Sequence, residues 1–166
     1  MRIRLSTIND IEEIMRIYDA ARITMRASGN YSQWVNGYPK REMVEDDIAR
    51  RVSYVIEGDD GVPHAVFMFS VEEDPTYALI EDGHWLDNEP YGVIHRIGSD
   101  GTMRGALAAA VEYCTGIIGN IRIDTHADNA IMQHVLEKNG FERCGTIFCH
   151  DGSPRVAFQL HTSEES

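Results

Sequence analysis

The sequence predicts an α/β (α+β) fold in which about four helices cover one mixed, mostly antiparallel, seven-stranded β-sheet. Strand-like alternation and helix-like spacing of apolar residues follow each other in the order β-α-α-β-β-β-α-β-α-β-β. That order mixes hairpins with crossover helices, which requires a mixed sheet covered on both faces. The 166 residues, 43% of them hydrophobic, suffice for one core, so we expect a single domain over residues 1–166.

The chain begins with a strand and a long amphipathic helix. Hydrophobic and charged residues alternate over residues 2–6, which predicts a half-buried strand. Apolar residues recur at helical spacing from about 8 to 25, and Thr7, three residues before Asp10, resembles a capping box. The Gly-Asn pair at 29–30 ends this helix.

A loop, a short helix and a hairpin follow. Residues 31–39 are aromatic, punctuated by Gly and Pro, and without periodicity, which is typical of a loop. We expect a short helix over residues 41–51. Residues 53–57 and 62–70 are predicted strands, and the Gly-Asp-Asp-Gly segment at 58–61 joins them as a hairpin.

The middle of the chain alternates irregular and regular structure. Residues 72–90 are acidic, aromatic and irregular, and residues 91–97 resume strand character. A glycine-bearing turn at 98–105 leads into an alanine-rich helix that ends near residue 114. Residues 120–125 form the next predicted strand.

The chain closes with a helix and a hairpin. Residues 128–139 are predicted to be helical, and Gly140 is well placed as a left-handed residue after the helix. Two strands, 142–150 and 155–161, flank a turn at 151–152.

The composition of the chain limits the kinds of partner that we expect it to bind. Twenty-seven Asp and Glu against 15 Lys and Arg give a net charge of -12, so the chain repels a phosphate backbone and we expect no nucleic-acid partner. The negative electrostatic field of such a chain would attract a cationic or amine-bearing substrate. The alternative is that the charge serves only solubility, as in many acidic proteins. The sequence has no apolar run of about 18 residues, so we expect no membrane partner. Three cysteines, without C-x-x-C spacing, favour a reducing cytoplasm over a disulfide framework or a zinc site, and we assign no metal.

The turn at 98–105 and the helix after it carry the strongest chemical signal. A helix N-terminus preceded by small residues presents unpaired N–H groups and partial positive charge to a phosphate or pyrophosphate. Gly101 and Gly105 allow close approach, and Arg104 adds charge, whereas Asp100 opposes an anion. The alternative is that these glycines only turn the chain. The segment is neither a P-loop nor a G-x-G-x-x-G dinucleotide fingerprint.

This loop and the helix that opens at Asn129 and closes with Gly140-Phe141 together resemble the GNAT superfamily of N-acetyltransferases. That family holds the pyrophosphate of coenzyme A on a Gln/Arg-x-x-Gly-x-Gly/Ala loop, and a later Asn-x-x-Ala-x-x-x-Tyr-like helix ends in Gly-Phe. The loop corresponds here to residues 102–107 (Thr-Met-Arg-Gly-Ala-Leu). Residues 3–14 are also similar to the family's first strand and helix, so the resemblance covers nearly the whole chain.

Three further motifs, Asn-Tyr-x-Gln-Trp, Asp-Pro-Thr-Tyr and Tyr-x-x-Ile-His-Arg-Ile, look like a bacterial branch of that superfamily. The resemblance implies transfer of an acetyl group from acetyl-CoA to a primary amine, most simply of a small molecule, by direct attack on the thioester. It also leaves a homodimer open. The implied coenzyme A contacts are His95, Arg96, Ile97, Gly101, Thr102, Met103, Arg104, Gly105, Ala106, Leu107, Asn129 and Leu136.

The chain departs from the family pattern at three positions. Thr102 replaces the usual Gln or Arg, and Leu107 replaces the usual Gly or Ala, although a leucine there can point into the core while its amide still donates. Leu136 stands where many relatives carry a tyrosine that protonates the departing thiolate. Another group or water must then supply that proton.

The catalytic base has several candidates. His95 comes first, because an unperturbed imidazole titrates near ~6.5 and can take the proton of an amine directly or through water. A structurally hydrogen-bonded strand histidine is the alternative. Glu81 and Asp74 are the next catalytic candidates, with their neighbours Glu73 and Asp82, although loop carboxylates are usually solvated.

The two loops at 31–39 and 72–90 are expected to choose the acceptor. Their aromatic side chains either form a wall for the acceptor or anchor the loops to the core. The predicted acceptor contacts are Gln33, Trp34, Tyr38, Tyr77, Trp85 and Tyr91.

Two other functions stay open at this point. A non-catalytic acyl-CoA-binding or interaction protein could use the same scaffold, because a fold does not confer a function. A nucleotide-phosphate binder could use the turn at 98–105, but the sequence shows no element that would recognise a base.

Overall fold

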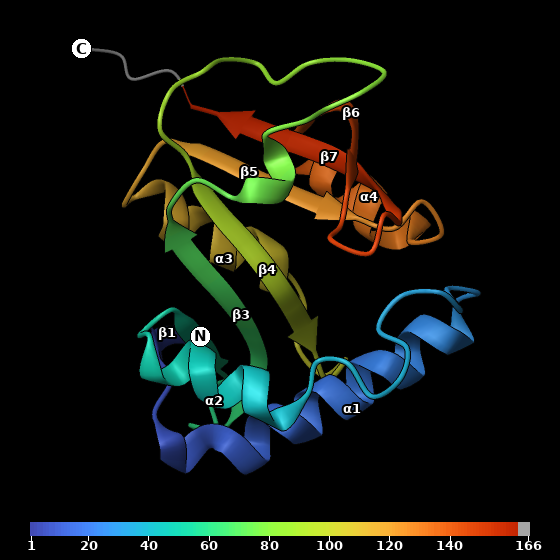
Figure 1. Cartoon of the computed structure of the whole chain (residues 1–166). Coiled ribbons are helices and arrows are strands. Elements are labelled where there is room, and N and C mark those ends of the chain that lie inside the picture. The colour runs from blue at the N-terminus through green and yellow to red at the C-terminus, as the bar shows by residue number, and fades with distance from the viewer. Residues whose placement is uncertain (163–166) are drawn as a thin grey trace. The chain divides into compact units, whose positions relative to one another are not determined.

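A computed structural model describes residues 1–162 of the chain (Figure 1). One seven-stranded sheet has the strand order β1-β2-β3-β4-β5-β7-β6. The pairs β1–β2, β2–β3, β5–β7 and β6–β7 are antiparallel, whereas β4–β5 is parallel. The fold class and element order predicted from the sequence are therefore confirmed. The strands are β1 (Arg2–Leu5), β2 (Ser53–Glu57), β3 (Pro63–Val71), β4 (Gly92–Ser99), β5 (Asn120–Thr125), β6 (Glu142–Phe148) and β7 (Pro154–His161).

The described residues also form four α-helices and two short 3-10 turns, η1 and η2. None of these helices combines the length and the apolar character that crossing a bilayer requires. The helices are α1 (Ile11–Ala27), α2 (Arg41–Ala49), α3 (Ala106–Thr115) and α4 (Ala130–Lys138), with η1 at Ile8–Asp10 and η2 at Pro75–Tyr77.

The chain divides into two compact units. The first unit comprises Met1–Phe69 and His95–Ala110, and the second comprises Ser70–Ile94 and the chain from Val111 onward. That all 166 residues act as one domain stays a prediction.

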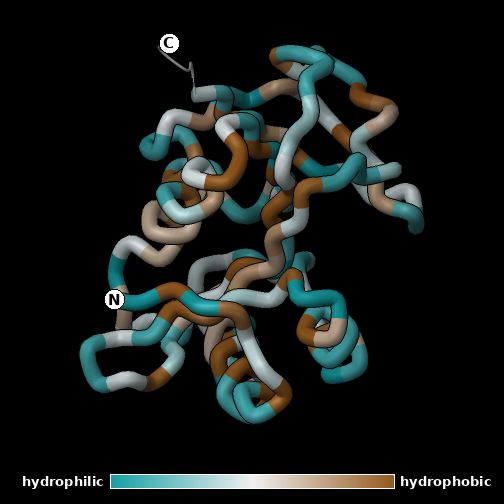
Figure 2. The backbone as a smooth tube through the Cα atoms, turned by 90° about the vertical axis from the view of Figure 1, so that its left-hand side faces the viewer, coloured by the Kyte–Doolittle hydropathy of each residue, from teal (hydrophilic) through white to brown (hydrophobic). Residues whose placement is uncertain are grey.

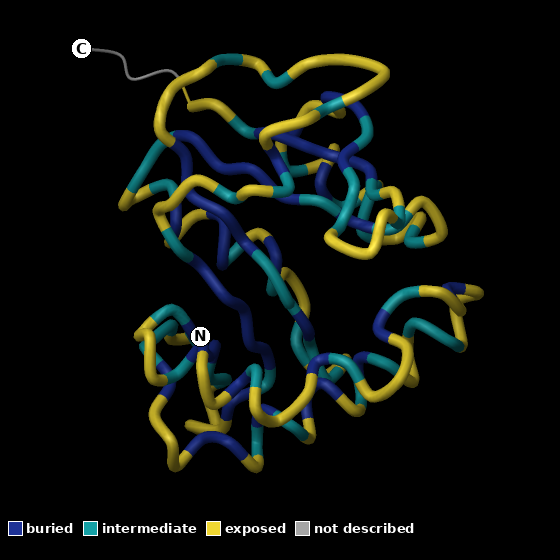
Figure 3. Tube along the Cα trace, viewed as in Figure 1, coloured by how far each residue is buried: buried dark blue, intermediate teal, exposed yellow. Residues whose placement is uncertain are grey.

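In the first unit, α1 packs its apolar stripe on α2 and on strands β2 and β3. The predicted capping box lies at the 3-10 turn η1 that leads into α1, where the Thr7 amide donates to Asp10 Oδ2 at 2.7 Å. Hydrophobic and hydrophilic residues alternate along the helices (Figure 2). The inward side chains of α1 include Ile14, Ile17 and Tyr18, which are at most 2% exposed. Strand β3 is buried along most of its length (Figure 3), so it forms the centre of this unit's core.

In the second unit, β7 lies between β5 and β6, and α4 runs close to them (Figure 1). Helix α4 is N-capped by Asn129, whose Oδ1 accepts from the Met132 amide at 3.0 Å. It ends as predicted, with Gly140 at a φ of 89° and the Phe141 amide donating to the Leu136 carbonyl at 3.0 Å. Leu136 and Phe141 are both buried under the helix.

The segment 72–90 is irregular, as predicted, yet it is tied to β6. The Glu81 amide donates to the Thr146 carbonyl at 2.9 Å, and the Thr146 amide donates to the Glu81 carbonyl at 2.8 Å. The backbones approach so closely here that a Cβ on Gly145 would lie 2.5 Å from the Glu81 carbonyl oxygen. Only glycine fits at this contact.

Replacing Gly145 by alanine should therefore loosen this segment and destabilise the protein. The matched control is Gly152→Ala in the β6–β7 turn, where φ is 83° and a Cβ meets nothing within 4 Å. Both variants introduce backbone strain, but only Gly145→Ala adds a clash, so it should lose about 1–3 kcal/mol more of the free energy of unfolding. Urea denaturation of both variants measures the difference, and equal losses would contradict the close approach.

Candidate active site

Strand β4 carries a backbone irregularity beside the candidate base. Arg96 has a φ of 50°, in the left-handed region that non-glycine residues seldom occupy. Its guanidinium donates to both Asp47 oxygens, from Nε at 2.9 Å and from Nη2 at 2.7 Å. The Tyr18 hydroxyl donates to the Arg96 carbonyl at 2.7 Å. These three bonds compensate the backbone strain and fix this point of the strand.

The Arg96–Asp47 pair is buried in the first unit. The Arg96 side chain is 13% exposed and the Asp47 side chain 5%. Burial alone would lower the pKa of Arg96, but the bonds to Asp47 outweigh it and raise that pKa above its ordinary value. The sequence predicts strand character over residues 91–97, but the left-handed Arg96 interrupts the regular strand between His95 and Ile97.

The backbone amides of the loop after β4 fall into two groups: some donate to side chains of the loop, and the others have no acceptor in the described part of the chain. The Gly101 amide donates to Ser99 Oγ at 3.2 Å, and the Thr102 amide donates to Asp100 Oδ1 at 3.0 Å. These two predicted coenzyme A donors are thus already bonded to the chain's own side chains. Among residues 1–162, no acceptor occurs for the successive amides from Met103 to Ala108, which include the first turn of α3.

That run of free amides fits a diphosphate. The N-terminus of α3 adds partial positive charge, and Arg104 is exposed with no ionic partner within the described part of the chain. Leu107 is only 6% exposed, so its side chain points into the core as expected while its amide stays available. The residues present can therefore hold the pyrophosphate group of coenzyme A.

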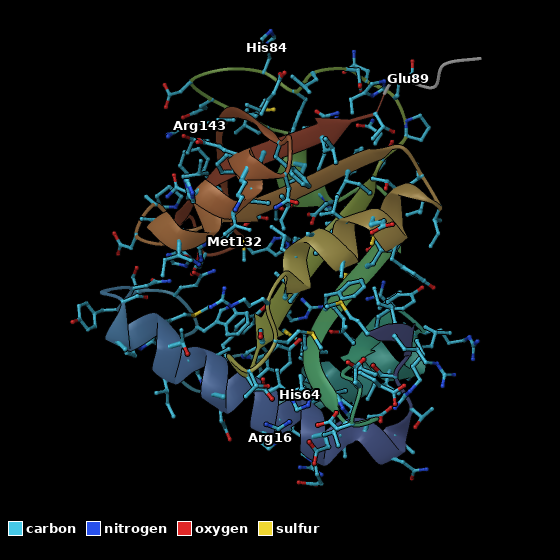
Figure 4. The ribbon with its side chains drawn as sticks, turned by 180° about the vertical axis from the view of Figure 1, so that it is seen from behind. Arg16, His64, His84, Glu89, Met132 and Arg143 are labelled. Carbon is cyan, nitrogen blue, oxygen red and sulfur yellow. The ribbon has the colours of Figure 1, made fainter. Side chains whose placement is uncertain are left out.

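The first unit also holds charged residues that the sequence analysis missed. His64 on β3 and Arg16 on α1 lie close together (Figure 4) and both contact the Asp100 carboxylate. His64 is 36 positions from Asp100 in the chain, so no local pattern could reveal the pair.

The three catalytic candidates differ in their surroundings. His95 is half-buried on β4, next to the irregularity at Arg96. Asp74 Oδ1 accepts from the Thr76 amide at 2.9 Å and from the Thr76 hydroxyl at 2.7 Å, so this carboxylate caps η2. Glu81 is exposed and is held through its backbone. Their catalytic roles stay predictions.

The predicted acceptor residues of the first unit anchor their loop. Trp34 is 9% exposed and packs edge-on against Tyr18, with ring centroids 5.3 Å apart. The ring centroid of Tyr38 lies 6.4 Å from that of Trp34. Gln33 Oε1 accepts a hydrogen bond from Asn30 Nδ2 at 2.8 Å. A contact of these side chains with an acceptor stays a prediction.

The aromatic residues of the second unit do gather, but they surround a cation. The Arg122 guanidinium on β5 lies 4.2 Å from the Trp85 ring centroid and 4.0 Å from that of Tyr91. Tyr77 is buried against Trp85, and its hydroxyl donates to Asp124 Oδ2 at 2.7 Å. Burial lowers the pKa of Arg122. These rings therefore anchor the 72–90 segment on β5, and their contact with an acceptor stays a prediction.

Two further predicted contacts serve α4 itself. Asn129 caps that helix, and Leu136 is fully buried beneath it. A contact of either residue with coenzyme A stays a prediction.

The second unit also has a small open pocket of about 230 Å³. Its lining is mostly apolar, with one imidazole. The lining residues are Pro75, Thr76, Leu79, Phe148 and His150.

Comparison with known proteins identifies the family. No protein-family model and no curated protein matches the chain. Among solved structures, a GNAT-family acetyltransferase from Streptococcus agalactiae superposes with a TM-score of 0.85 at 33% identity, covering 98% of this chain and 96% of that chain.

More distant structures share the fold. A GNAT-family acetyltransferase from Listeria monocytogenes matches with a TM-score of 0.70 at 17% identity, covering 97% of this chain and 94% of its own. Ard1 from Thermoplasma volcanium matches with a TM-score of 0.64 at 16% identity, covering 98% of each chain. With the 33% identical relative matched over nearly its whole length, the chain belongs to the GNAT family of acetyltransferases.

Proposed function

We propose that this protein transfers an acetyl group from acetyl-CoA to a primary amine of a small molecule by direct attack on the thioester. The observation that carries the proposal is the run of free amides from Met103 to Ala108 at the start of α3, in a chain of this family. The net charge of -12 supports a cationic acceptor.

The chain's own residues have three tasks in this reaction. The amides of α3 and Arg104 bind the diphosphate, and the backbone of β4 near Arg96 orients the pantetheine arm. Acetyl-CoA brings the acyl group already activated as a thioester. His95 takes the proton from the ammonium form of the acceptor, directly or through a water, because only the neutral amine is nucleophilic.

The proton for the departing thiolate comes from water or another group. Leu136 stands where many relatives carry a tyrosine, and its fully buried aliphatic side chain has no proton to give. This observation also favours a second candidate function, a non-catalytic acyl-CoA-binding protein on the same scaffold.

Acetyl-CoA should raise the melting temperature, because a ligand that binds only the native state stabilises it. At a ligand concentration of about 100 times Kd, the stabilisation of roughly 2.7 kcal/mol corresponds to a shift of about 5–10 °C. AMP and NAD should cause little shift. Differential scanning fluorimetry with the three ligands is the measurement, and equal shifts with all three would indicate a general nucleotide-phosphate binder.

Turnover separates the two candidate functions. Release of free thiol from acetyl-CoA is followed across a panel of small primary amines, N-terminal peptides and lysine peptides. We expect amine-dependent release with at least one small amine. Tight acetyl-CoA binding without release for any acceptor would favour the non-catalytic protein.

A further inference from the structure

A cluster of charged side chains surrounds the start of the loop that leads to α3. His64 on β3 lies between two carboxylates: its Nδ1 is 2.6 Å from Asp100 Oδ2, and its Nε2 is 2.8 Å from Asp60 Oδ2. Both ring nitrogens can donate only when the imidazole is protonated. The contact with Asp100, followed by that with Asp60, raises the pKa of His64 above its ordinary value.

Asp100 contacts both His64 and the loop residue Thr102. Its Oδ1 accepts from the Thr102 amide at 3.0 Å and from the Thr102 hydroxyl at 2.6 Å. The Asp100 amide in turn donates to the His64 carbonyl at 2.9 Å. His64 is thereby joined to Thr102, the residue just before the run of free amides.

The charge of Asp100 has to be compensated at this place. Its carboxylate is 4% exposed and lies two residues before Thr102, where it would repel an incoming diphosphate. Arg16 Nη1 donates to Asp100 Oδ2 at 3.1 Å, but the same guanidinium also pairs with Glu13 at 2.9 Å. Burial alone would raise the pKa of Asp100, whereas the hydrogen bonds from Thr102, His64 and Arg16 lower it well below its ordinary value. The carboxylate is thus ionised, and His64 supplies the second positive charge beside it.

We propose that His64 is a positioning residue for coenzyme A: as an imidazolium between Asp60 and Asp100, it holds Asp100 and Thr102 in place and neutralises Asp100, so that the amides that follow can donate to a diphosphate. This inference rests on the proposed function. The groups that face His64 are Asp60, Asp100 and Thr102, with Arg16 and its partner Glu13 behind Asp100.

The sign of the pH dependence follows from the protonated form. Because the carboxylates raise the pKa of His64, the charge is present at neutral pH and is lost as the pH rises through that raised value. Affinity for coenzyme A should therefore be constant at low pH and fall on the alkaline side of the ordinary histidine range.

The test is calorimetric titration of the full chain with dephospho-coenzyme A between pH 5.5 and 8.5. This probe keeps the diphosphate but lacks the 3′-phosphate, which itself titrates near pH 6. We expect His64→Gln to weaken binding about tenfold at pH 6 and to abolish the pH dependence, since it removes a charge-assisted contact. NMR titration of the His64 ring in the free protein should give a midpoint where the affinity begins to fall, and bound dephospho-coenzyme A should move that midpoint to higher pH.

Two further variants separate charge from structure. Asp60→Asn should move the midpoint of the affinity profile to lower pH, whereas Asp59→Asn removes the same charge from a fully exposed neighbour and should not move it. In the His64→Gln background, Asp100→Asn should restore most of the lost affinity, because it removes the uncompensated charge and keeps an oxygen for Thr102.

The outcomes separate the two proposals. If the unmodified protein binds neither acetyl-CoA nor dephospho-coenzyme A, the proposed function is wrong. If it binds and His64→Gln binds equally well at every pH, the His64 proposal alone is overturned. Should His64→Gln fail to fold, an unchanged midpoint in Asp60→Asn would overturn it just as well.

Discussion

Replacing Asp47 by asparagine is expected to lower the free energy of unfolding by about 3–5 kcal/mol, because Arg96 then keeps its charge in a buried place without a counter-ion. Asp47 accepts two hydrogen bonds from Arg96 and is 5% exposed. In the asparagine variant, the side-chain NH2 group would replace one of the two oxygens, and it would face an N–H donor of Arg96 in place of an acceptor. Urea denaturation measures the loss.

The neighbouring Asp46→Asn is the matched control, because Asp46 is exposed on the same helix. It should change stability by less than about 0.5 kcal/mol. The double variant Asp47→Leu/Arg96→Met should recover much of the loss, since an apolar pair can replace a buried ion pair. A loss in Asp47→Asn as small as that in Asp46→Asn would show that the pair does not hold β4.

The Asp47 variant also has a functional consequence. The pair and the Tyr18 hydroxyl together hold Arg96 in its left-handed conformation, between His95 and Ile97. A relaxed β4 would displace the backbone that we assign to the pantetheine arm, and a displacement of about 1 Å can cost on the order of 100-fold in rate. Asp47→Asn should therefore lower kcat even at temperatures where it stays folded.

Replacing His95 by glutamine should lower kcat by about 10²–10⁴-fold, the usual contribution of a positioned general base. The affinity for acetyl-CoA should change little, because glutamine leaves the β4 backbone intact. The pH–rate profile of kcat/KM should also lose its acidic limb, which reports the base in the free enzyme. Stopped-flow or steady-state detection of thiol release gives these values.

His84→Gln is the control for the same substitution at an exposed site, where the side chain points outward (Figure 4). It should leave both kcat and the pH profile unchanged. If His95→Gln keeps its acidic limb, the role of base moves to Glu81 or Asp74. Between these two, Asp74 already accepts two hydrogen bonds from Thr76, so Glu81→Gln is then the variant to test first.

The order of helices and strands could be derived from the sequence because neighbouring residues encode it. Alternation in residues 120–125 predicted the bounds of β5, and the helical spacing of apolar residues such as Ile14 and Tyr18 predicted the buried stripe of α1. The glycine turn before α3 was likewise visible, since a helix start needs no distant partner to present its amides.

The availability of each amide in that turn could not be derived in the same way. Gly101 and Thr102 looked like donors for the ligand, yet Ser99 and Asp100 already accept their bonds. Short polar side chains compete for nearby backbone groups, and the winner depends on the local conformation.

Length, patterning and two glycine-containing motifs were thus enough to establish the fold class and to suggest the family, because these depend on residues a few positions apart. Packing alone decided that His64 meets Asp100, that Asp47 meets Arg96, and that Trp85 and Tyr91 enclose Arg122. Each of these contacts joins residues at least 30 positions apart, so its energy depends on which elements come together. Charges and rings on separate elements leave no periodic trace in the chain, and for this reason the electrostatics of the candidate site became visible only in the folded structure.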